Sequence, residues 1–553
     1  MQYRAQLSSH PQLMANPTFK EQVRFLSAIL DGRSGTERMP SGKRSTALAD
    51  IEALVSLLNV TSLDDPGGNR VVAATGRIAL DGVHVYLAAS HPQWTEEEGS
   101  ETVVKPSSDS VKSILESWKV SEDVGWEVHL SQLLKLINEY RQSDELSSPE
   151  KRDYLYLFTL RRCHRKLANR MILGRRIWGQ DPFKLIHDYL ISENPNFHSF
   201  RIELHRNSRE GLGKRGINPY AGSVPPLRTL TYPVNVKNVA TWLEFLQEKY
   251  STVWKYLIKT IPATDTTKEE FGPKQQSETS MTDIRKAERS LEVIYEISCT
   301  PLLKNIVGAI PGLASKLMGV QLEYDHDTTE LDAADIAEGD VRLDAFLKMI
   351  FSPLRAITHL RRRFLKACHP GIKVRLVKIP MDEGPTQGEE CKKLLRNPER
   401  FVRGFSLTWA QGRVDEFENR AQSNEPLQRT WVNLNQHPEA VLMVRIYQLG
   451  PEKRLELFGS DIPLASSRQL CFCCYQLARL LNQQNLRPVP KLVPPGTDGV
   501  VRAWSPPPGI PEVVLFTLKD HLSEVVDRMV DRELDIPYSD ASPWDDSDYD
   551  GDD

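Results

Sequence analysis

The chain has 553 residues and a mass of 62.9 kDa, which predicts two to four domains at about 100–200 residues each. It carries 70 Lys and Arg against 74 Asp and Glu, a balance that excludes a globally basic nucleic-acid binder but allows a local basic patch. Seven Cys in so long a chain argue against a disulfide scaffold. No secretory signal or membrane-spanning run is visible, so we expect an intracellular protein, cytoplasmic or nuclear, with no membrane partner.

Residues 1–370 are predicted to form a mostly helical N-terminal region. Residues 70–89 are an exception, because β-branched residues flank an Asp81-Gly82 turn and predict a β-hairpin. We expect loops at 91–110 and 208–232 and a polar linker near 263–282. Apolar residues recur at helical spacing in residues 19–30, 47–58, 126–140, 151–173, 239–261, 283–318 and 341–368.

Residues 371–540 alternate between strand and helix patterns. We expect strands at 372–380, 429–434, 455–464, 499–504 and 513–517, and helices at 439–447, 471–481 and 519–530. Such alternation predicts an α/β domain of three layers, with a sheet between helices. The end of the chain, residues 541–553, is predicted to be a disordered acidic tail, since residues 540–553 hold seven Asp and no basic residue.

The motifs with the clearest chemistry lie in this C-terminal domain. His437-Pro438-Glu439 opens one predicted helix, and Cys471-Phe472-Cys473-Cys474 opens the next. Chance alone gives roughly one His-x-Glu in such a chain but only roughly 0.1 Cys-x-x-Cys pairs. The coincidence of both motifs at helix starts in one domain therefore indicates a shared site.

These residue types favour zinc. Cys471 and Cys474 share a helix face, and a helix N-terminus favours the thiolate form. With His437 they make three ligands, which leaves one tetrahedral position open, as in catalytic zinc sites. Glu439 can face the metal without binding it and transfer protons. A structural zinc site remains the alternative, and Cys473 could replace Cys474 as a ligand.

His-x-Glu followed by Cys-x-x-Cys is the pattern of zinc nucleobase deaminases. The sequence resembles the zinc-dependent cytidine-deaminase-like superfamily, in particular a branch expanded in fungi. That branch shows His-Ala-Glu, then Ser-Lys-x-x-Cys-x-x-Cys, then His-Gly-…-Trp-x-x-Pro; the matching segments here are residues 437–439, 467–474 and 498–507. Pro438 stands where that branch has Ala, and Asp498 stands where it has His. The resemblance implies a mixed five-stranded sheet between helices, with the metal at two helix N-termini.

The resemblance also implies a function. We expect a zinc-dependent hydrolytic deaminase of cytosine or adenine in nucleic acid or a nucleotide, with zinc-held hydroxide as nucleophile and Glu439 as proton shuttle. The alternative is an inactive deaminase-like scaffold with a structural zinc, which binds nucleic acid or protein.

Other residues are weaker candidates for substrate contact. Ser467 and Arg468 could line the pocket or cap a loop, and Trp504 could stack on a base or pack in the core. Asn435 could meet the sugar or base edge or lie in a polar loop. For nucleic-acid contact the candidates are Arg361, Arg362, Arg363 and Lys366, which belong to one of two basic segments, residues 161–176 and 355–378. A solvated helix face is the alternative for both segments.

Overall fold

The computed structural model describes most of the chain in eighteen stretches. They are residues 18–30, 34–35, 46–60, 70–79, 82–91, 101–114, 124–142, 148–193, 195, 197–205, 211–220, 229–260, 281–319, 339–363, 372–380, 436–459, 461–484 and 489–534. The predicted strand at 429–434, the acidic tail and nearly all of the predicted linker lie outside these stretches.

A mixed six-stranded sheet organises the described chain, in the order β3-β6-β2-β1-β7-β8. The β1–β2 and β1–β7 pairs are antiparallel, as is β3–β6, whereas β2–β6 and β7–β8 are parallel. The six strands are β1 (Val72–Ala79), β2 (Gly82–His91), β3 (Glu101–Val104), β6 (Ile372–Pro380), β7 (Ile462–Ser466) and β8 (Leu492–Val493).

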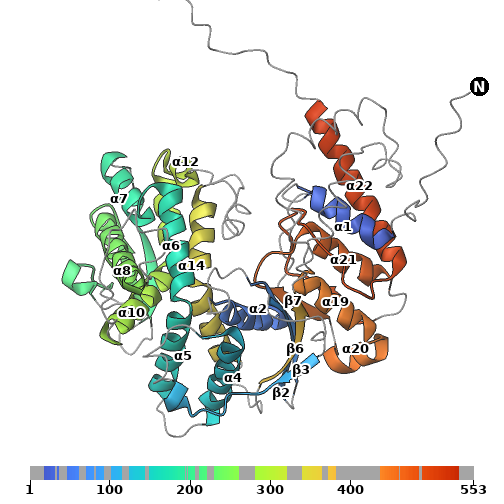
Figure 1. Ribbon diagram of the computed structural model, residues 1–553. Coiled ribbons are helices and arrows are strands. Elements are labelled where there is room, and N and C mark those ends of the chain that lie inside the picture. Colours follow the sequence, from blue (N-terminus) through green and yellow to red (C-terminus); the bar gives the residue numbers. More distant parts are fainter. Residues whose placement is uncertain are drawn as a thin grey trace, which may run out of the picture.

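Helices cover both faces of this sheet (Figure 1). Alternate strand residues point to opposite faces, so Val72 and Ala74 join one apolar core while Ala73 joins the other. The first core includes α2 (Thr46–Leu58) and α4 (Trp126–Gln142), and the second includes α19 (Pro438–Gln448) and α21 (Phe472–Gln483). Burial on both faces explains why the strands are rich in Val, Leu and Ala.

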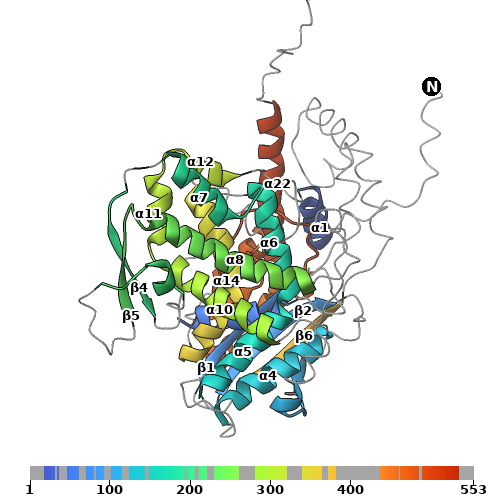
Figure 2. The ribbon, with the colours of Figure 1, turned by 90° about the vertical axis from the view of Figure 1, so that its left-hand side faces the viewer.

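A helical body extends from the α2 side of the sheet, with a two-stranded β4–β5 sheet at its margin (Figure 2). The chain enters this body after β3 and α4 and returns to the sheet at β6. Its elements are α5 (Ser148–Arg162), α6 (His164–Trp178), α7 (Pro182–Glu193), β4 (Phe200–His205), β5 (Thr229–Val234), α8 (Val239–Thr260), α10 (Met281–Ser298), α11 (Leu302–Ala309), α12 (Leu313–Met318) and α14 (Gly339–Arg363).

The two ends of the described chain meet on the opposite side of the sheet. Helix α1 (Phe19–Ile29) packs along α22 (Glu512–Leu534), and the Phe19 and Phe516 rings form an edge-to-face pair with centroids 5.3 Å apart. Helix α20 (Pro451–Phe458) completes this layer. The first described helix is therefore part of the same layer as α19 and α21.

The predicted α/β class, the hairpin and the strand at 372–380 are confirmed, but the predicted boundary at residue 370 does not bound the sheet. Three of its six strands precede residue 105, so the N-terminal region supplies half of the strands of the predicted C-terminal domain. The sheet has six strands, one more than the five that the resemblance implies. Strand pairing between distant segments depends on tertiary contacts, which local patterns do not record.

Several local predictions are wrong. The run 513–517 is helical in α22, where Val514, Leu518 and Leu522 are buried at four-residue spacing. Residues 455–458 belong to α20, which Pro451 starts at its first turn. Residues 499–504 contribute only an isolated bridge from Val500 to Ser34. The predicted loops at 91–110 and 208–232 contain β3 and the start of β5.

Candidate metal centre

His437 stands immediately before α19, with extended backbone at φ −75° and ψ 131°. Pro438 occupies the first helical position, where its missing N–H costs no hydrogen bond. Glu439 follows in the first turn and is only 4% exposed. This local sequence therefore places an imidazole and a carboxyl group side by side at a helix start.

Cys471 stands at the equivalent point of α21. It is the N-cap residue, and its Sγ accepts a hydrogen bond from the Cys474 backbone N–H at 3.5 Å. Because Cys471 and Cys474 are three residues apart, both thiols project from the same side of the helix start. Both side chains are buried.

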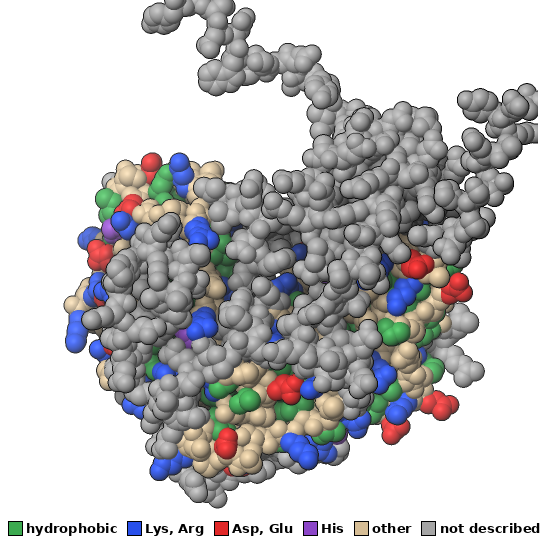
Figure 3. Space-filling model, viewed as in Figure 1, with side chains coloured by type: hydrophobic (Ala, Val, Ile, Leu, Met, Phe, Trp, Pro, Cys, Tyr) green, Lys and Arg blue, Asp and Glu red, His purple; other side chains and the backbone are tan. Residues whose placement is uncertain are grey.

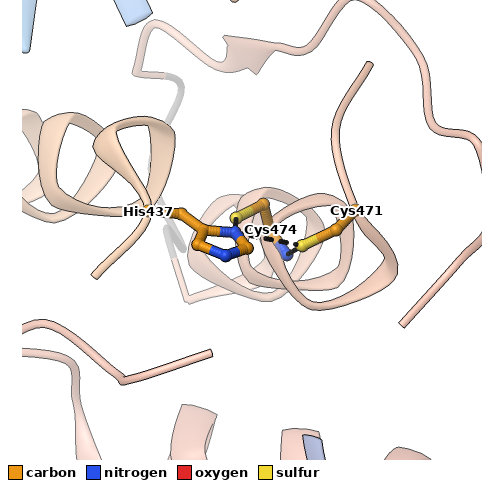
Figure 4. Close-up of side chains that lie close together, drawn as sticks. All are labelled: His437, Cys471 and Cys474. Atoms are coloured by element: carbon orange, nitrogen blue, oxygen red, sulfur yellow. Dashed lines mark hydrogen bonds between the residues drawn. The ribbon is translucent and has the colours of Figure 1, made fainter. Parts of the chain in front are cut away.

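The structure brings the three predicted ligands together, as Figure 4 shows. His437 Nδ1 lies 3.4 Å from Cys471 Sγ and 3.4 Å from Cys474 Sγ. All three ligand atoms lie within 4.8 Å of one another, and the group could hold a metal ion. Cys473 does not belong to this group, so the geometry favours Cys474 as the second thiol ligand.

The electrostatics of the group favour one thiolate. Burial alone would raise the pKa of Cys471, but hydrogen bonds from Cys473 and Cys474 and the charge of His437 hold it well below its ordinary value. Burial would lower the pKa of His437, but the Cys471 thiolate raises it above its usual value. Burial and the same thiolate raise the pKa of Cys474 well above its ordinary value. The pKa shifts therefore favour the thiolate form at Cys471 over Cys474.

Glu439 has a specific partner that the sequence did not reveal. Ser466, the last residue of β7, donates its hydroxyl hydrogen bond to Glu439 Oε1. The Ser466 Oγ accepts in turn from the backbone N–H of Arg468 at 3.3 Å. Glu439 is therefore held in place at the carboxyl end of β7. The sequence could not predict this contact, because a single Ser at the end of a strand does not indicate a partner for Glu439.

A second segment fixes the backbone around Cys471. The Phe472 N–H donates to the Val500 carbonyl at 2.8 Å, and the Thr497 hydroxyl donates to the Leu470 carbonyl at 2.7 Å. Gly499 adopts a left-handed φ of 75°, which glycine tolerates best. The segment that resembles the third family motif thus clamps the helix start that carries the thiols.

Asp498 forms an ion pair in this segment. Its Oδ2 accepts from the Arg502 guanidinium at 2.8 Å, and its side chain is 5% exposed. Burial raises the pKa of Asp498, although the Arg502 charge acts in the opposite direction. Arg502 also opposes the protonation of His437, so this pair belongs to the electrostatic surroundings of the metal group.

The weaker candidate residues have different fates. Ser467 Oγ accepts from the Val72 N–H at 3.0 Å, which extends the β1–β7 pairing and gives this side chain a structural contact. Arg468 is half-buried beside Ser466. Trp504 is fully buried, so the core packing that we weighed as the alternative holds, and its ring offers no face to a base. Asn435 lies outside the described residues.

The two basic segments differ in exposure: most cations of residues 161–176 are buried, whereas Arg355, Lys373 and Arg375 of the second segment are exposed. In residues 161–176 the side chains of Arg161, Arg162, Lys166 and Arg170 are buried. Arg361, Arg362 and Arg363 end α14, and their side chains, like all of Lys366, lie outside the described residues. Figure 3 shows Lys and Arg scattered among other side chains over the visible face. The burial of these four cations therefore argues against contact between residues 161–176 and the phosphates of a nucleic acid.

All five cysteines in the described stretches are free. Among the helices of those stretches, none combines the length and apolar character that crossing a bilayer requires.

Comparison of the chain with protein-family models, with curated proteins and with solved structures finds no match. The site geometry and the sequence motifs are thus the observations from which function must be argued.

Proposed function

We propose that the protein is a zinc-dependent hydrolytic deaminase of a nucleobase, cytosine or adenine, in nucleic acid or a nucleotide. The observation that carries the proposal is the convergence of His437, Cys471 and Cys474 at two helix starts, with buried Glu439 two residues from His437. One His and two Cys are a donor set of catalytic zinc sites.

The distances fit zinc. Tetrahedral zinc has bonds of about 2.0–2.3 Å to nitrogen and sulfur, so its ligand atoms lie about 3.6 Å apart. The two separations from His437 Nδ1 to the sulfurs, 3.4 Å each, agree with that value. Soft thiolate ligands select zinc over calcium or magnesium. When bound, zinc would supply a water molecule activated as nucleophile.

The roles of the protein groups follow from their positions. His437, Cys471 and Cys474 would hold the metal. Glu439 is outside this ligand group, and its carboxyl is oriented by the Ser466 hydroxyl. A carboxylate in this place can accept a proton from the attacking water and deliver it to the ring nitrogen and the departing ammonia. The Ser466 hydrogen bond would hold one oxygen of the carboxyl in place during both transfers.

A single pair of variants tests the mechanism. Purified full-length protein is assayed for ammonia release from a panel of nucleosides, nucleotides, single-stranded DNA and RNA. Glu439→Gln should lower the rate about 100-fold or more, because it removes the proton carrier, and it should retain zinc by elemental analysis. Glu452→Gln, which alters an exposed Glu of α20, should change neither. Unchanged ammonia release in Glu439→Gln would overturn the role of Glu439.

Metal content tests the ligand assignment separately. Cys471→Ser should lose zinc, whereas Cys299→Ser, at an exposed free cysteine, should keep it. Zinc bound to the native chain without deamination of any panel member would reject the enzyme and leave a structural zinc in a binding scaffold.

A further inference from the structure

Helix α21 has a second face, turned away from the metal group. A cavity of about 290 Å³ lies there between α21 and α22, and Gly35 also lines it. Phe472, Gln476 and Leu480 line it from α21 at four-residue spacing, which places them on one helix face. None of the three metal ligands lines this cavity.

Two of the residues that line the cavity carry a buried polar atom that has no hydrogen-bond partner among the described residues. Gln476 is only 7% exposed, and its amide oxygen has no hydrogen-bond partner among the described residues. His521 Nδ1, on the α22 side, is also buried, and the described chain provides no partner for it. Because buried polar atoms are nearly always hydrogen-bonded, these two indicate that a ligand completes the site.

The rim of the cavity is positive. Arg479 and Arg528 line it, and Glu524 is the one acid among its described lining residues. Arg528 is held in place, since its Nη2 donates to the Gly35 carbonyl at 2.7 Å and its Nε donates to the Glu524 carbonyl at 3.3 Å. Guanidinium groups recognise carboxylate and phosphate through paired hydrogen bonds.

We propose that this cavity binds a small organic anion. The carboxylate or phosphate of the ligand would meet Arg479 and Arg528, while an N–H or O–H of the ligand would donate to Gln476. Phe472 and Leu480 supply an apolar wall for its carbon skeleton. The volume is at the lower end of the range for small-molecule sites, about 300–1,000 Å³, which favours a compact ligand.

This site is independent of the proposed deaminase activity. It shares α21 with the metal group but uses the opposite face. Phe472 follows Cys471 directly, and its backbone N–H is part of the clamp to Val500. A ligand in the cavity therefore packs against the helix start that carries the thiols.

Calorimetric titration of the full-length protein tests the proposal. The probes are inorganic phosphate, O-phospho-L-serine and L-glutamate, which separate phosphate from carboxylate recognition. At least one organic probe should bind more tightly than about 1 mM. Arg479→Ala should weaken that binding about tenfold or more, because it removes a charge-assisted contact. Arg445→Ala, at an exposed position of α19, should leave it unchanged.

Two further variants separate the contacts. Gln476→Leu should weaken the binding of O-phospho-L-serine and L-glutamate, whose ammonium groups would donate to the Gln476 amide oxygen. Cys471→Ser should retain binding, which would distinguish this site from the metal centre. Failure of all three probes to bind, or equal affinity in Arg479→Ala and the native chain, would overturn the proposal.

Discussion

Ser27 of α1 provides a sharp test of the architecture, because it joins the first described helix to the segment that follows α21. Its side chain is fully buried. The Oγ accepts from the Trp504 N–H at 3.0 Å, and the hydroxyl lies 3.1 Å from the Trp504 carbonyl and 2.9 Å from the Arg24 carbonyl. Ser27 and Trp504 are 477 residues apart in sequence.

Ser27→Ala leaves the buried Trp504 N–H without its acceptor and removes the hydroxyl donor. An unsatisfied buried donor costs about 1–3 kcal/mol, and the lost donor hydrogen bond adds about 1 kcal/mol. We therefore expect the free energy of unfolding, measured by urea denaturation, to fall by about 2–4 kcal/mol.

Ser56→Ala is the matched control. Ser56 also lies within a helix, but its hydroxyl only donates to the Glu52 carbonyl of the same helix, and the residue is half-buried. Its loss should change the free energy of unfolding by less than about 0.5 kcal/mol. Equal effects of the two substitutions would refute the contact between α1 and the Trp504 segment.

Three further substitutions test buried charges. Burial raises the pKa of Asp181 to about 6. The contribution of Asp181 to the free energy of unfolding is therefore most favourable below its unfolded pKa and is lost as the pH rises through 6. In urea titrations, Asp181→Asn should stabilise the protein by up to about 3 kcal/mol at pH 8 and have little effect near pH 4. Burial lowers the pKa of His129 to about 3. The free energy of unfolding should therefore fall by about 3 kcal/mol between pH 6.5 and pH 4, as the unfolded chain takes up a proton that the folded chain does not. His129→Gln should reduce this dependence of the unfolding free energy on pH. His359→Leu removes the imidazole that lies 2.5 Å from the buried Asp50 carboxyl. It should lower the free energy of unfolding by roughly 1–3 kcal/mol, since the imidazole is partly exposed. Adding Asp50→Asn should recover part of this loss, and an equal loss in the double variant would contradict the pairing.

Local patterns in the sequence were sufficient for the elements whose periodicity is strong. The helix at 439–447 and the hairpin at 70–89 were predicted because apolar spacing and an Asp-Gly turn act within a few residues. The predicted helix at 151–173 is two helices, because the chain breaks at Cys163 between α5 and α6. The predicted helix at 283–318 is three, with breaks near Pro301 and Gly312.

The sequence alone also predicted that His437, Cys471 and Cys474 form one group. Cys471 and Cys474 are three residues apart on a helix start, so their proximity is a local property, and the His437 motif opens another helix of the same domain. Only the fold decided that the imidazole meets both thiols at 3.4 Å. The Ser466 contact to Glu439 also depends on the fold, because it joins a strand end to a separate helix.

The sequence by itself determined the helices and strands with strong local periodicity and the three candidate ligands, His437, Cys471 and Cys474. The tertiary structure decided which strands share the sheet, which cations are buried and which face of α21 is hollow. The reason is physical: helical periodicity and Cys-x-x-Cys spacing operate over one or two turns, whereas the β2–β6 pairing joins residues nearly 290 positions apart, such as Val83 and Ile372. Burial of Arg170 or Trp504 likewise depends on neighbours that lie far away in the chain.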